Sequence, residues 1–326
     1  MRGLWLESGR AAVVDDLPRP EPFEGESRIA VIAAGVCATD LALARGYMGF
    51  AGVPGHEFVG RALDGPFAGL RVVGGINAGC GNCARCRNED PAGLDARHCE
   101  TRSVLGILGR AGAFAEEIRL PHGNLIPVPE GVSDEAATFT EPLAAALAIL
   151  ETGIPVDGAR ALVIGDGKLG LLCAAALSSA GAVTEVCGRH PERSKLLQAM
   201  GARLAAFHAR PSQPPRGAYD LVVEATGHPA VLAEAILCAR PRGAVVLKTT
   251  AESPASLDLA PLVVNEVRLV GSRCGRFQPA LDALAEKRIN VDPLVQSRFG
   301  LAEGVAAMEQ AGQRGILKVL VDVARP

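Results

Sequence analysis

Aromatic residues, an excess of charge of one sign and long apolar runs are all scarce in this chain of 326 residues. Aromatics make up 4% of the chain, which leaves little material for stacking the bases of a single-stranded nucleic acid. Lysine and arginine number 33 against 36 acidic residues, a net charge of -3 that favours neither nucleic acid nor an anionic membrane as partner. No apolar stretch reaches the roughly 20 residues that cross a bilayer.

Other features point to a compact enzyme of the cytoplasm. Glu7 interrupts the first apolar residues too early for a signal peptide. The nine cysteines are an odd number, which argues against a disulfide framework. Hydrophobic residues make up 48% of the chain and allow a large core, and the length predicts two domains. We therefore expect a cytoplasmic enzyme with a small-molecule substrate.

Two patterns divide the chain. Up to about residue 140 it has short apolar runs that end at glycine or proline, such as 27–35 and 69–75, which are typical of β-strands joined by tight turns. From there on, apolar runs alternate with helical runs of about ten residues, which predicts a doubly wound parallel sheet, so the fold class is α/β. The expected strands are 161–164, 183–187, 221–224, 244–247 and 266–270, and the expected helices are 142–150, 171–180, 192–200, 230–239, 278–287 and 302–311. The last apolar run, 318–321, is expected to return to the β-rich part.

A glycine motif predicts a dinucleotide site. Gly165-Asp166-Gly167-Lys168-Leu169-Gly170 fits G-x-G-x-x-G between a predicted strand and a predicted helix. Gly165 would form the turn, Gly167 would admit the pyrophosphate, and Gly170 would let helix and strand pack closely. The helix N-terminus would then offer N–H groups to the phosphates. The alternative is a plain turn between strand and helix.

The end of the second predicted strand indicates which nucleotide binds. NAD sites usually have an acid there to hold the ribose 2′-hydroxyl. Here the strand is followed by Gly188, Arg189 and His190. Because a guanidinium can grip a 2′-phosphate, we expect NADP(H) rather than NAD(H), with Arg189 as the main contact and His190 as a second one. The alternative is that Arg189 is a solvated surface residue.

Four of the cysteines have metal-ligand spacing. Cys80, Cys83, Cys86 and Cys99 can supply four thiolates to one tetrahedral zinc ion. A closed four-thiolate site is structural, since no position is open to a substrate. The alternative, four unrelated free cysteines, ignores the regular spacing.

A second, dispersed set has the residue types of a catalytic metal site. Cys37, His56 and Glu141 offer one thiolate, one imidazole and one carboxylate, and Glu57 follows His56 directly. Such a set can bind zinc and leave a fourth position open. A lone cysteine in a β-domain is otherwise a core residue, and a lone histidine a hydrogen-bonded turn residue. Residue types alone leave both readings open.

The sequence resembles the zinc-dependent medium-chain dehydrogenase/reductase family of the alcohol dehydrogenase type. The matching segments, in the family's order, are Gly35-Val36-Cys37-Ala38-Thr39-Asp40, Gly55-His56-Glu57, the four-cysteine lobe, Glu141-Pro142-Leu143, the glycine motif and Val223-Glu224-Ala225-Thr226-Gly227. The resemblance implies a GroES-like catalytic domain split around a Rossmann domain. The implied boundaries are 1–145 with a zinc lobe at 78–100, then 146–272 for the cofactor, and 273–326 as the return to the catalytic domain.

The resemblance also implies metal ligands. Catalytic zinc would lie on Cys37, His56 and a third ligand, and Glu141 resembles the glutamate that serves in the polyol and glucose dehydrogenase branches, directly or through water. Glu57 resembles a glutamate that can exchange into the metal shell. Asp40 resembles a carboxylate that holds the histidine ligand and fixes its tautomer.

Zinc would polarise the substrate oxygen, and hydride would pass between an alcohol, polyol or sugar and NADP, or back to the carbonyl. Thr39 matches the hydroxyl that takes the alcohol proton, and Thr226 is expected at the cofactor. Family members are commonly dimers or tetramers, so we expect a homodimer or homotetramer. Two other functions compete: a zinc-free quinone or enone reductase of the same superfamily, and a non-catalytic protein that binds zinc and nucleotide.

Three positions depart from the family pattern. Ala42 stands where many members have a proton-relaying histidine, so the proton must leave by another route. Residues 88–92 look like an insertion in a surface loop before Cys99. Lys248 ends a predicted strand, where we expect a solvated side chain rather than a contact with cofactor or substrate.

Overall fold

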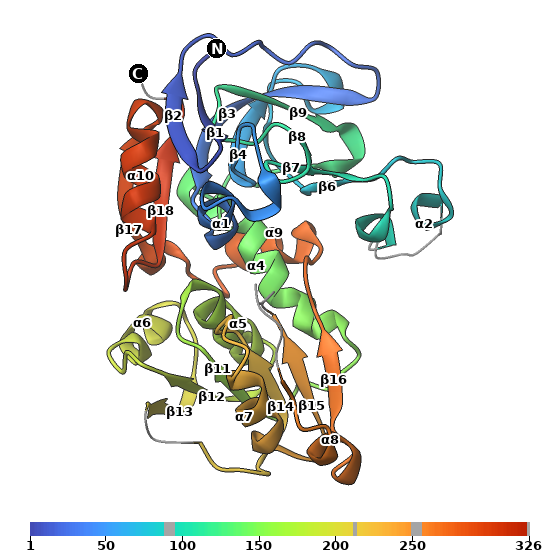
Figure 1. Ribbon diagram of the computed structural model, residues 1–326, viewed down its shortest axis with the longest axis vertical. Helices are drawn as coiled ribbons and strands as arrows, with labels where there is room; N and C mark the ends of the chain where they lie inside the picture. Colours follow the sequence, from blue (N-terminus) through green and yellow to red (C-terminus); the bar gives the residue numbers. More distant parts are fainter. Residues whose placement is uncertain (88–94, 211–213, 249–255, 325–326) are drawn as a thin grey trace. The chain divides into compact units, whose positions relative to one another are not determined.

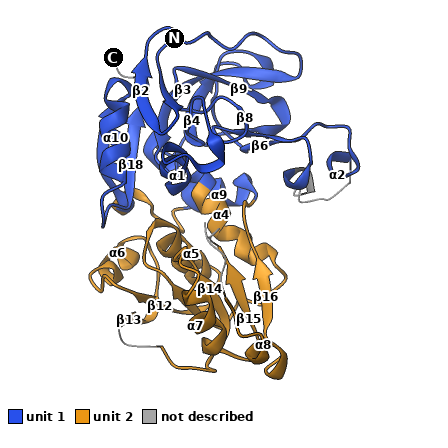
Figure 2. Ribbon diagram, in the orientation of Figure 1, with its two compact units in different colours: residues 1–141, 276–286, 294–326 blue, residues 142–275, 287–293 orange. Residues whose placement is uncertain are grey.

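The computed structural model describes residues 1–87, 95–210, 214–248 and 256–324. The predicted insertion at 88–92 lies outside the described residues. The chain divides into two compact units (Figure 2): unit 1 is Met1–Glu141, Arg276–Glu286 and Leu294–Pro326, and unit 2 is Pro142–Gly275 and Lys287–Pro293. In the described part of the chain, no helix is both long and apolar enough to cross a bilayer.

Unit 1 is built on a seven-stranded sheet with the order β10-β5-β4-β3-β18-β17, in which β9 also pairs with β3. Figure 1 labels β3, β4, β9, β17 and β18 of this sheet. Its strands are β3 (Glu26–Gly35), β4 (Glu57–Ala62), β5 (Arg71–Gly74), β9 (Glu117–Pro121), β10 (Leu125–Pro127), β17 (Val295–Gly300) and β18 (Lys318–Asp322). Alternate residues of β3 are buried over most of its length, as the two-residue period of a strand with one covered face requires. The last strand, β18, which contains the apolar run 318–321, pairs antiparallel with β3.

Smaller elements complete unit 1. A two-stranded and a three-stranded sheet accompany the large one. These strands are β1 (Gly3–Glu7), β2 (Arg10–Val14), β6 (Asn77–Ala78), β7 (Ser103–Leu105) and β8 (Gly109–Arg110), and the helices are α1 (Ala38–Ala44), α2 (Ala84–Arg87), α3 (Asp134–Ala137), α9 (Phe277–Ala285) and α10 (Gly304–Ala311). Helix α1 starts directly after β3, and this order places Cys37 between a strand and a helix.

Unit 2 contains the predicted parallel sheet, with the order β13-β12-β11-β14-β15-β16. Its strands are β11 (Arg160–Ile164), β12 (Val183–Gly188), β13 (Leu204–Ala209), β14 (Tyr219–Glu224), β15 (Ala239–Leu247) and β16 (Arg268–Gly271), and the helices are α4 (Thr140–Leu147), α5 (Lys168–Ser179), α6 (Arg193–Ala199), α7 (Val231–Cys238) and α8 (Ala260–Val264). The last four residues of β11 are buried, because both faces of a parallel sheet are covered by other elements.

Sequence analysis did not predict β13. Its six residues include three alanines and none is fully buried, so they carry a weak strand signal. Strand β13 pairs in parallel with β12 and forms the edge of the sheet.

The strand order changes direction next to β11. Strands β12 and β14 pair with β11 from opposite sides, and the chain leaves β11 through the glycine motif into α5. Ligands of doubly wound sheets bind at such a point, beyond the carboxyl ends of the strands. The fold therefore puts the glycine motif where a ligand site is expected.

Candidate metal centres and nucleotide site

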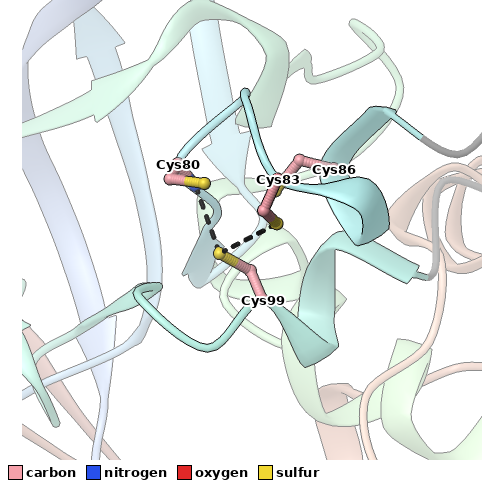
Figure 3. Close-up of side chains that lie close together, drawn as sticks. All are labelled: Cys80, Cys83, Cys86 and Cys99. Atoms are coloured by element: carbon pink, nitrogen blue, oxygen red, sulfur yellow. Dashed lines mark hydrogen bonds between the residues drawn. The ribbon is translucent and has the colours of Figure 1, made fainter.

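The four spaced cysteines converge in unit 1. One sulfur from each of Cys80, Cys83, Cys86 and Cys99 lies within 4.8 Å of the other three. Figure 3 shows Cys80, Cys83 and Cys99 around a common point, with Cys86 on helix α2 beside them. The Cys83 and Cys99 sulfurs are 3.8 Å apart, and the Cys80 amide donates to the Cys99 sulfur at 3.4 Å.

The environment of these thiols suits a thiolate-binding ion. The backbone amide of Asn82 lowers the pKa of Cys80 to about 6, and the amide of Cys80 lowers the pKa of Cys99. Burial raises the pKa of Cys86 to about 11. Four thiolates this close repel one another without a cation, whereas a tetrahedral Zn²⁺ neutralises them. The donor set therefore fits structural zinc.

A second group forms from segments distant in sequence. Ligand atoms of Cys37, His56 and Glu57 lie within 4.8 Å of one another. Cys37 is the residue before α1, His56 precedes β4, and Glu57 is its first residue. His56 is 3% exposed and Glu57 is fully buried. A thiolate, an imidazole and a carboxylate that converge in a buried place match the donors that zinc takes in catalytic sites.

Asp40, fully buried on α1, organises this group. Its carboxylate accepts hydrogen bonds from the amide of Cys37 at 2.8 Å and the amide of Gly55 at 3.1 Å, which joins the segments that carry Cys37 and His56. Its Oδ1 lies 3.3 Å from Nδ1 of His56. Burial lowers the pKa of His56, but the charges of Asp40 and Cys37 outweigh burial and raise that pKa well above its usual range. Asp40 thus holds the Nδ1 side of the ring and leaves Nε2 for a ligand role.

Lys318 is a buried partner of this group that sequence analysis missed. Its ammonium forms an ion pair with Glu57, and both side chains are fully buried. A Cβ on Gly35 would overlap the ammonium, so only glycine leaves room for the pair there. The Lys318 nitrogen also lies 5.1 Å from the centre of the Phe139 ring. The available signal was a lysine opening the apolar run 318–321, a residue type that is almost never buried unpaired.

Two predicted catalytic residues lie outside this group. Glu141 is the second residue of α4 and is half-buried, and it does not join Cys37, His56 and Glu57 in the group of described residues within 4.8 Å. The Thr39 hydroxyl lies 3.9 Å from the Cys37 sulfur, so it is next to the group. Glu57 is therefore the carboxylate with an oxygen within 4.8 Å of the ligand atoms that Cys37 and His56 could offer.

The glycine motif of unit 2 leaves space for a phosphate. Gly165 has a φ of 122°, and a Cβ there would lie 2.7 Å from the Ala225 carbonyl oxygen. A Cβ on Gly170 would overlap the Gly165 carbonyl, whereas one on Gly167 would meet nothing within 4 Å. Gly167 precedes α5, a helix of 12 residues whose first turn has no side-chain cap. Open space before an uncapped helix N-terminus fits a pyrophosphate.

The other residues predicted to contact the nucleotide lie on three segments of unit 2. Lys168 and Leu169 begin α5, Arg189 is exposed and His190 is half-buried after β12. Thr226 follows β14, and its hydroxyl donates to the Glu224 carboxylate at 2.5 Å.

The side chain of Lys248 is buried, whereas sequence analysis predicted that it would be solvated. It is 9% exposed, and its ammonium donates to the carbonyls of Ala145 and Arg273 at 2.5 and 3.0 Å and to the Ser272 hydroxyl at 3.1 Å. Lys248 thus joins helix α4 to the segment after β16, because three oxygen acceptors converge on it.

Known protein families and solved structures match this chain over nearly its whole length. The sequence matches the model of the alcohol dehydrogenase GroES-like domain over residues 24–130 and that of the glucose dehydrogenase C-terminus over 140–323. An L-threonine 3-dehydrogenase of Streptomyces avermitilis is 30% identical, over 98% of this chain and 96% of the relative. A candidate zinc-binding dehydrogenase of Sinorhizobium meliloti 1021, solved with NADP, superposes with a TM-score of 0.86 at 25% identity over 99% of both chains. A structure from Escherichia coli CFT073, described as a short chain alcohol dehydrogenase with NADH, gives 0.87 at 25% identity, again over 99% of both chains.

A GroES-like unit with two candidate metal clusters and a Rossmann unit with a glycine motif define a zinc-type dehydrogenase. The chain belongs to the zinc-dependent medium-chain dehydrogenase/reductase family and is an oxidoreductase of its alcohol dehydrogenase type.

The cysteine lobe gives a first prediction. We expect Cys99→Ser to lower the zinc content by one ion per chain and to lower the melting temperature, because three thiolates no longer close the tetrahedron. Metal analysis and thermal unfolding measure the two effects. Cys274→Ser, at a half-buried cysteine outside both clusters, is the control and should keep the full zinc content. An unchanged zinc content in Cys99→Ser would contradict the assignment.

The buried ion pair gives a second prediction. Lys318→Met should lower the free energy of unfolding by about 3–5 kcal/mol, because it leaves the Glu57 carboxylate buried without its cation. Glu57→Gln/Lys318→Met removes both charges and should recover most of that loss. Arg2→Met breaks an exposed pair in the same unit, in which the Asp15 side chain is 74% exposed, and should cost far less than Lys318→Met because solvent screens the pair. Denaturant titration measures all three, and equal losses in the single and double variants would refute the pairing.

Proposed function

We propose that this protein oxidises an alcohol, polyol or sugar with NADP⁺, or reduces the matching carbonyl, at a zinc ion held by unit 1. Unit 1 serves as the catalytic domain and unit 2 as the cofactor domain. The sequence predicts the divisions at residues 145 and 272, and the two units divide at 141 and 275, with 287–293 also in unit 2. The observation that carries the proposal is the convergence of the half-buried Cys37 with the buried His56 and Glu57. Zinc-free reductases and plain nucleotide-binding proteins have no need of such a donor set.

Each residue near the proposed zinc ion would have a distinct role. Cys37 and His56 would hold zinc, and Glu57, within 4.8 Å of both, is the nearer candidate for the third ligand, with Glu141 as the alternative. When bound, zinc supplies a Lewis acid for the substrate oxygen and the nicotinamide carries the hydride. Asp40 holds the Nδ1 side of His56, which directs Nε2 to the ion.

Thr39 is the group proposed to handle the substrate proton. Its hydroxyl lies 3.9 Å from the Cys37 sulfur, so a substrate oxygen close to the metal ligands is also close to this hydroxyl. A hydroxyl can accept the alcohol proton while passing on its own. Because Ala42 offers no titratable group, the onward route is proposed to run through cofactor hydroxyls, water or Glu57.

The nucleotide is proposed to be NADP(H) in preference to NAD(H). Arg189 is exposed directly after β12, and His190 follows it. A guanidinium there can bind a 2′-phosphate with paired hydrogen bonds. Gly165, Gly167, Lys168, Leu169 and Gly170 would cradle the pyrophosphate, with Thr226 beside them.

An exposed apolar edge of unit 2 supports a homo-oligomer. Strand β16 is the edge of the parallel sheet, and Val263 and Val264 of the preceding helix α8 are 75% and 78% exposed. Unpaired strand edges and exposed apolar side chains are suited to pairing with a second copy. We therefore propose a homodimer through this edge, or a tetramer of such dimers. The nine cysteines, all within the described residues, form no disulfide with one another, which suits a cytoplasmic location.

The oligomer proposal predicts a mass change. Val264→Asp should convert the wild-type oligomer to a monomer in light scattering, because it buries a charge at the interface. Asp282→Asn on α9 of unit 1 is the control and should leave the mass unchanged. A monomeric wild type would refute the proposal.

The function itself is tested with zinc-loaded protein. We expect NADP⁺ reduction with members of an alcohol, polyol and sugar panel, and a higher kcat/KM with NADP⁺ than with NAD⁺. Cys37→Ser should abolish turnover and lower the zinc content by one ion, while NADPH binding and the melting temperature stay close to wild type. Full turnover in Cys37→Ser would favour a zinc-free reductase, and a wild type inactive on every substrate would favour a binding protein.

A paired comparison identifies the third ligand. Glu57→Gln is made in the Lys318→Met variant and compared with Lys318→Met, so that no ammonium is left buried without its carboxylate, and Glu141→Gln is compared with the wild type. We expect Glu57→Gln to weaken zinc binding more, because Glu57 lies in the group of candidate ligands and Glu141 does not. The reverse order would assign the third ligand to Glu141.

A further inference from the structure

The carboxyl end of β12 lacks the acid that NAD-binding sheets usually have there. The strand ends at Gly188 and continues into Arg189 and His190. In NAD-binding Rossmann folds an acid about 20 residues after the glycine motif accepts the ribose 2′-hydroxyl. None of the three residues at the end of the strand, 188–190, is an acid, but the structure brings a carboxylate to this place from another segment.

Asp166, the second residue of the glycine motif, fills the space beside Gly188. A Cβ built on Gly188 would overlap the Cβ, Cγ and Oδ2 of Asp166. The Asp166 side chain is 7% exposed, and its Oδ2 accepts the amides of Arg189 at 2.8 Å and of His190 at 2.7 Å. The carboxylate of Asp166 thus lies where the side chain of the strand-end residue would begin.

The charge of this carboxylate is only loosely balanced. Nη1 of Arg193, the first residue of α6, lies 3.7 Å from Oδ1, longer than a hydrogen bond, and donates to the backbone carbonyl of Asp166. The two amides occupy Oδ2, so Oδ1 retains the capacity to accept a hydroxyl hydrogen. Asp166 is therefore an acid that holds the turn with one oxygen and can meet a ligand with the other.

We propose that Asp166 sets the balance between NAD(H) and NADP(H), an inference that rests on the proposed binding of a nicotinamide nucleotide by unit 2. Its carboxylate accepts the 2′-hydroxyl of NAD(H) and repels the 2′-phosphate of NADP(H), which carries nearly two negative charges. Arg189 attracts the same phosphate. The protein consequently binds both nucleotides, with the preference for NADP(H) created by Arg189 and limited by Asp166.

The test is the ratio of two dissociation constants, measured for NADH and NADPH by calorimetry on the zinc-loaded full chain. Asp166→Asn keeps an oxygen for the two amides and removes the charge. It should tighten NADPH binding and weaken NADH binding, and so shift the ratio toward NADPH by roughly tenfold. Equal changes in both constants, or an unchanged ratio, would overturn the proposal, because a merely structural role affects both nucleotides alike.

Two further variants separate the possible causes. Glu192→Gln removes an exposed carboxylate from the same turn, where it lies 3.4 Å from His190, and should shift the ratio less than twofold because the charge is screened by solvent. A shift as large as that of Asp166→Asn would overturn the specific role of Asp166. Arg189→Gln should weaken the binding of NADPH and leave the binding of NADH unchanged. If it does not, the proposed preference for NADP(H) is refuted, and the effect of Asp166→Asn on the ratio of dissociation constants still tests the role of Asp166.

Relocating the acid guards against misfolding of the turn. Gly188 has no left-handed φ, so its backbone accepts an L-residue once residue 166 is a glycine that vacates the space. Asp166→Gly alone should favour NADPH, and Asp166→Gly/Gly188→Asp should restore NADH binding by returning an acid to the strand end. A double variant with the same ratio as Asp166→Gly would contradict the proposal.

Discussion

Charge neutrality in a buried site is the constraint on which unit 1 depends. Cys37, Asp40 and Glu57 supply three negative charges when ionised, and Lys318 supplies one positive charge. The remainder is two negative charges, which is the charge that one divalent cation neutralises. Buried charges without partners cost several kcal/mol each, so the site favours binding of such an ion. When the ion is missing, the raised pKa of His56 lets a protonated imidazole make up part of the deficit.

The same constraint explains why the chain returns to unit 1 at its end. Strand β18 brings Lys318 under Gly35 of β3 and next to Glu57 of β4, residues that lie far away in the sequence. Burial lowers the pKa of Lys318 to about 8, opposed by the charges of Cys37 and Asp40, so the negative neighbours maintain its charge. Loss of β18 would therefore remove a sheet strand and leave the Glu57 carboxylate without the charge of Lys318.

Features set by local spacing were predictable, and features set by tertiary packing were not. The residues of the cysteine lobe lie within one short segment of the chain, and so do those of the glycine motif. The structure brings the four cysteines together and places the glycine motif before helix α5. The parallel sheet was predicted except for β13, whose alanines resemble a helix or a loop. The burial and contacts of Lys318, Asp166 and Lys248 were not predicted, because the partners of these residues lie on other elements. No pattern along the chain shows what balances their charges. Lys248 also shows that a polar residue at a strand end can be buried when carbonyls converge on it.

The turn after β12 shows a limit of one rule for reading nucleotide preference. That rule examines a single position, the last residue of the second strand, and there it finds Gly188. A ligand, however, responds to the field of all nearby charges, and those on Asp166, Arg189, Glu192 and Arg193 come from two segments. A glycine at the strand end is itself what admits the carboxylate from the glycine motif, since any larger residue would collide with it. The absence of an acid at position 188 and the presence of one at position 166 are therefore a single structural fact.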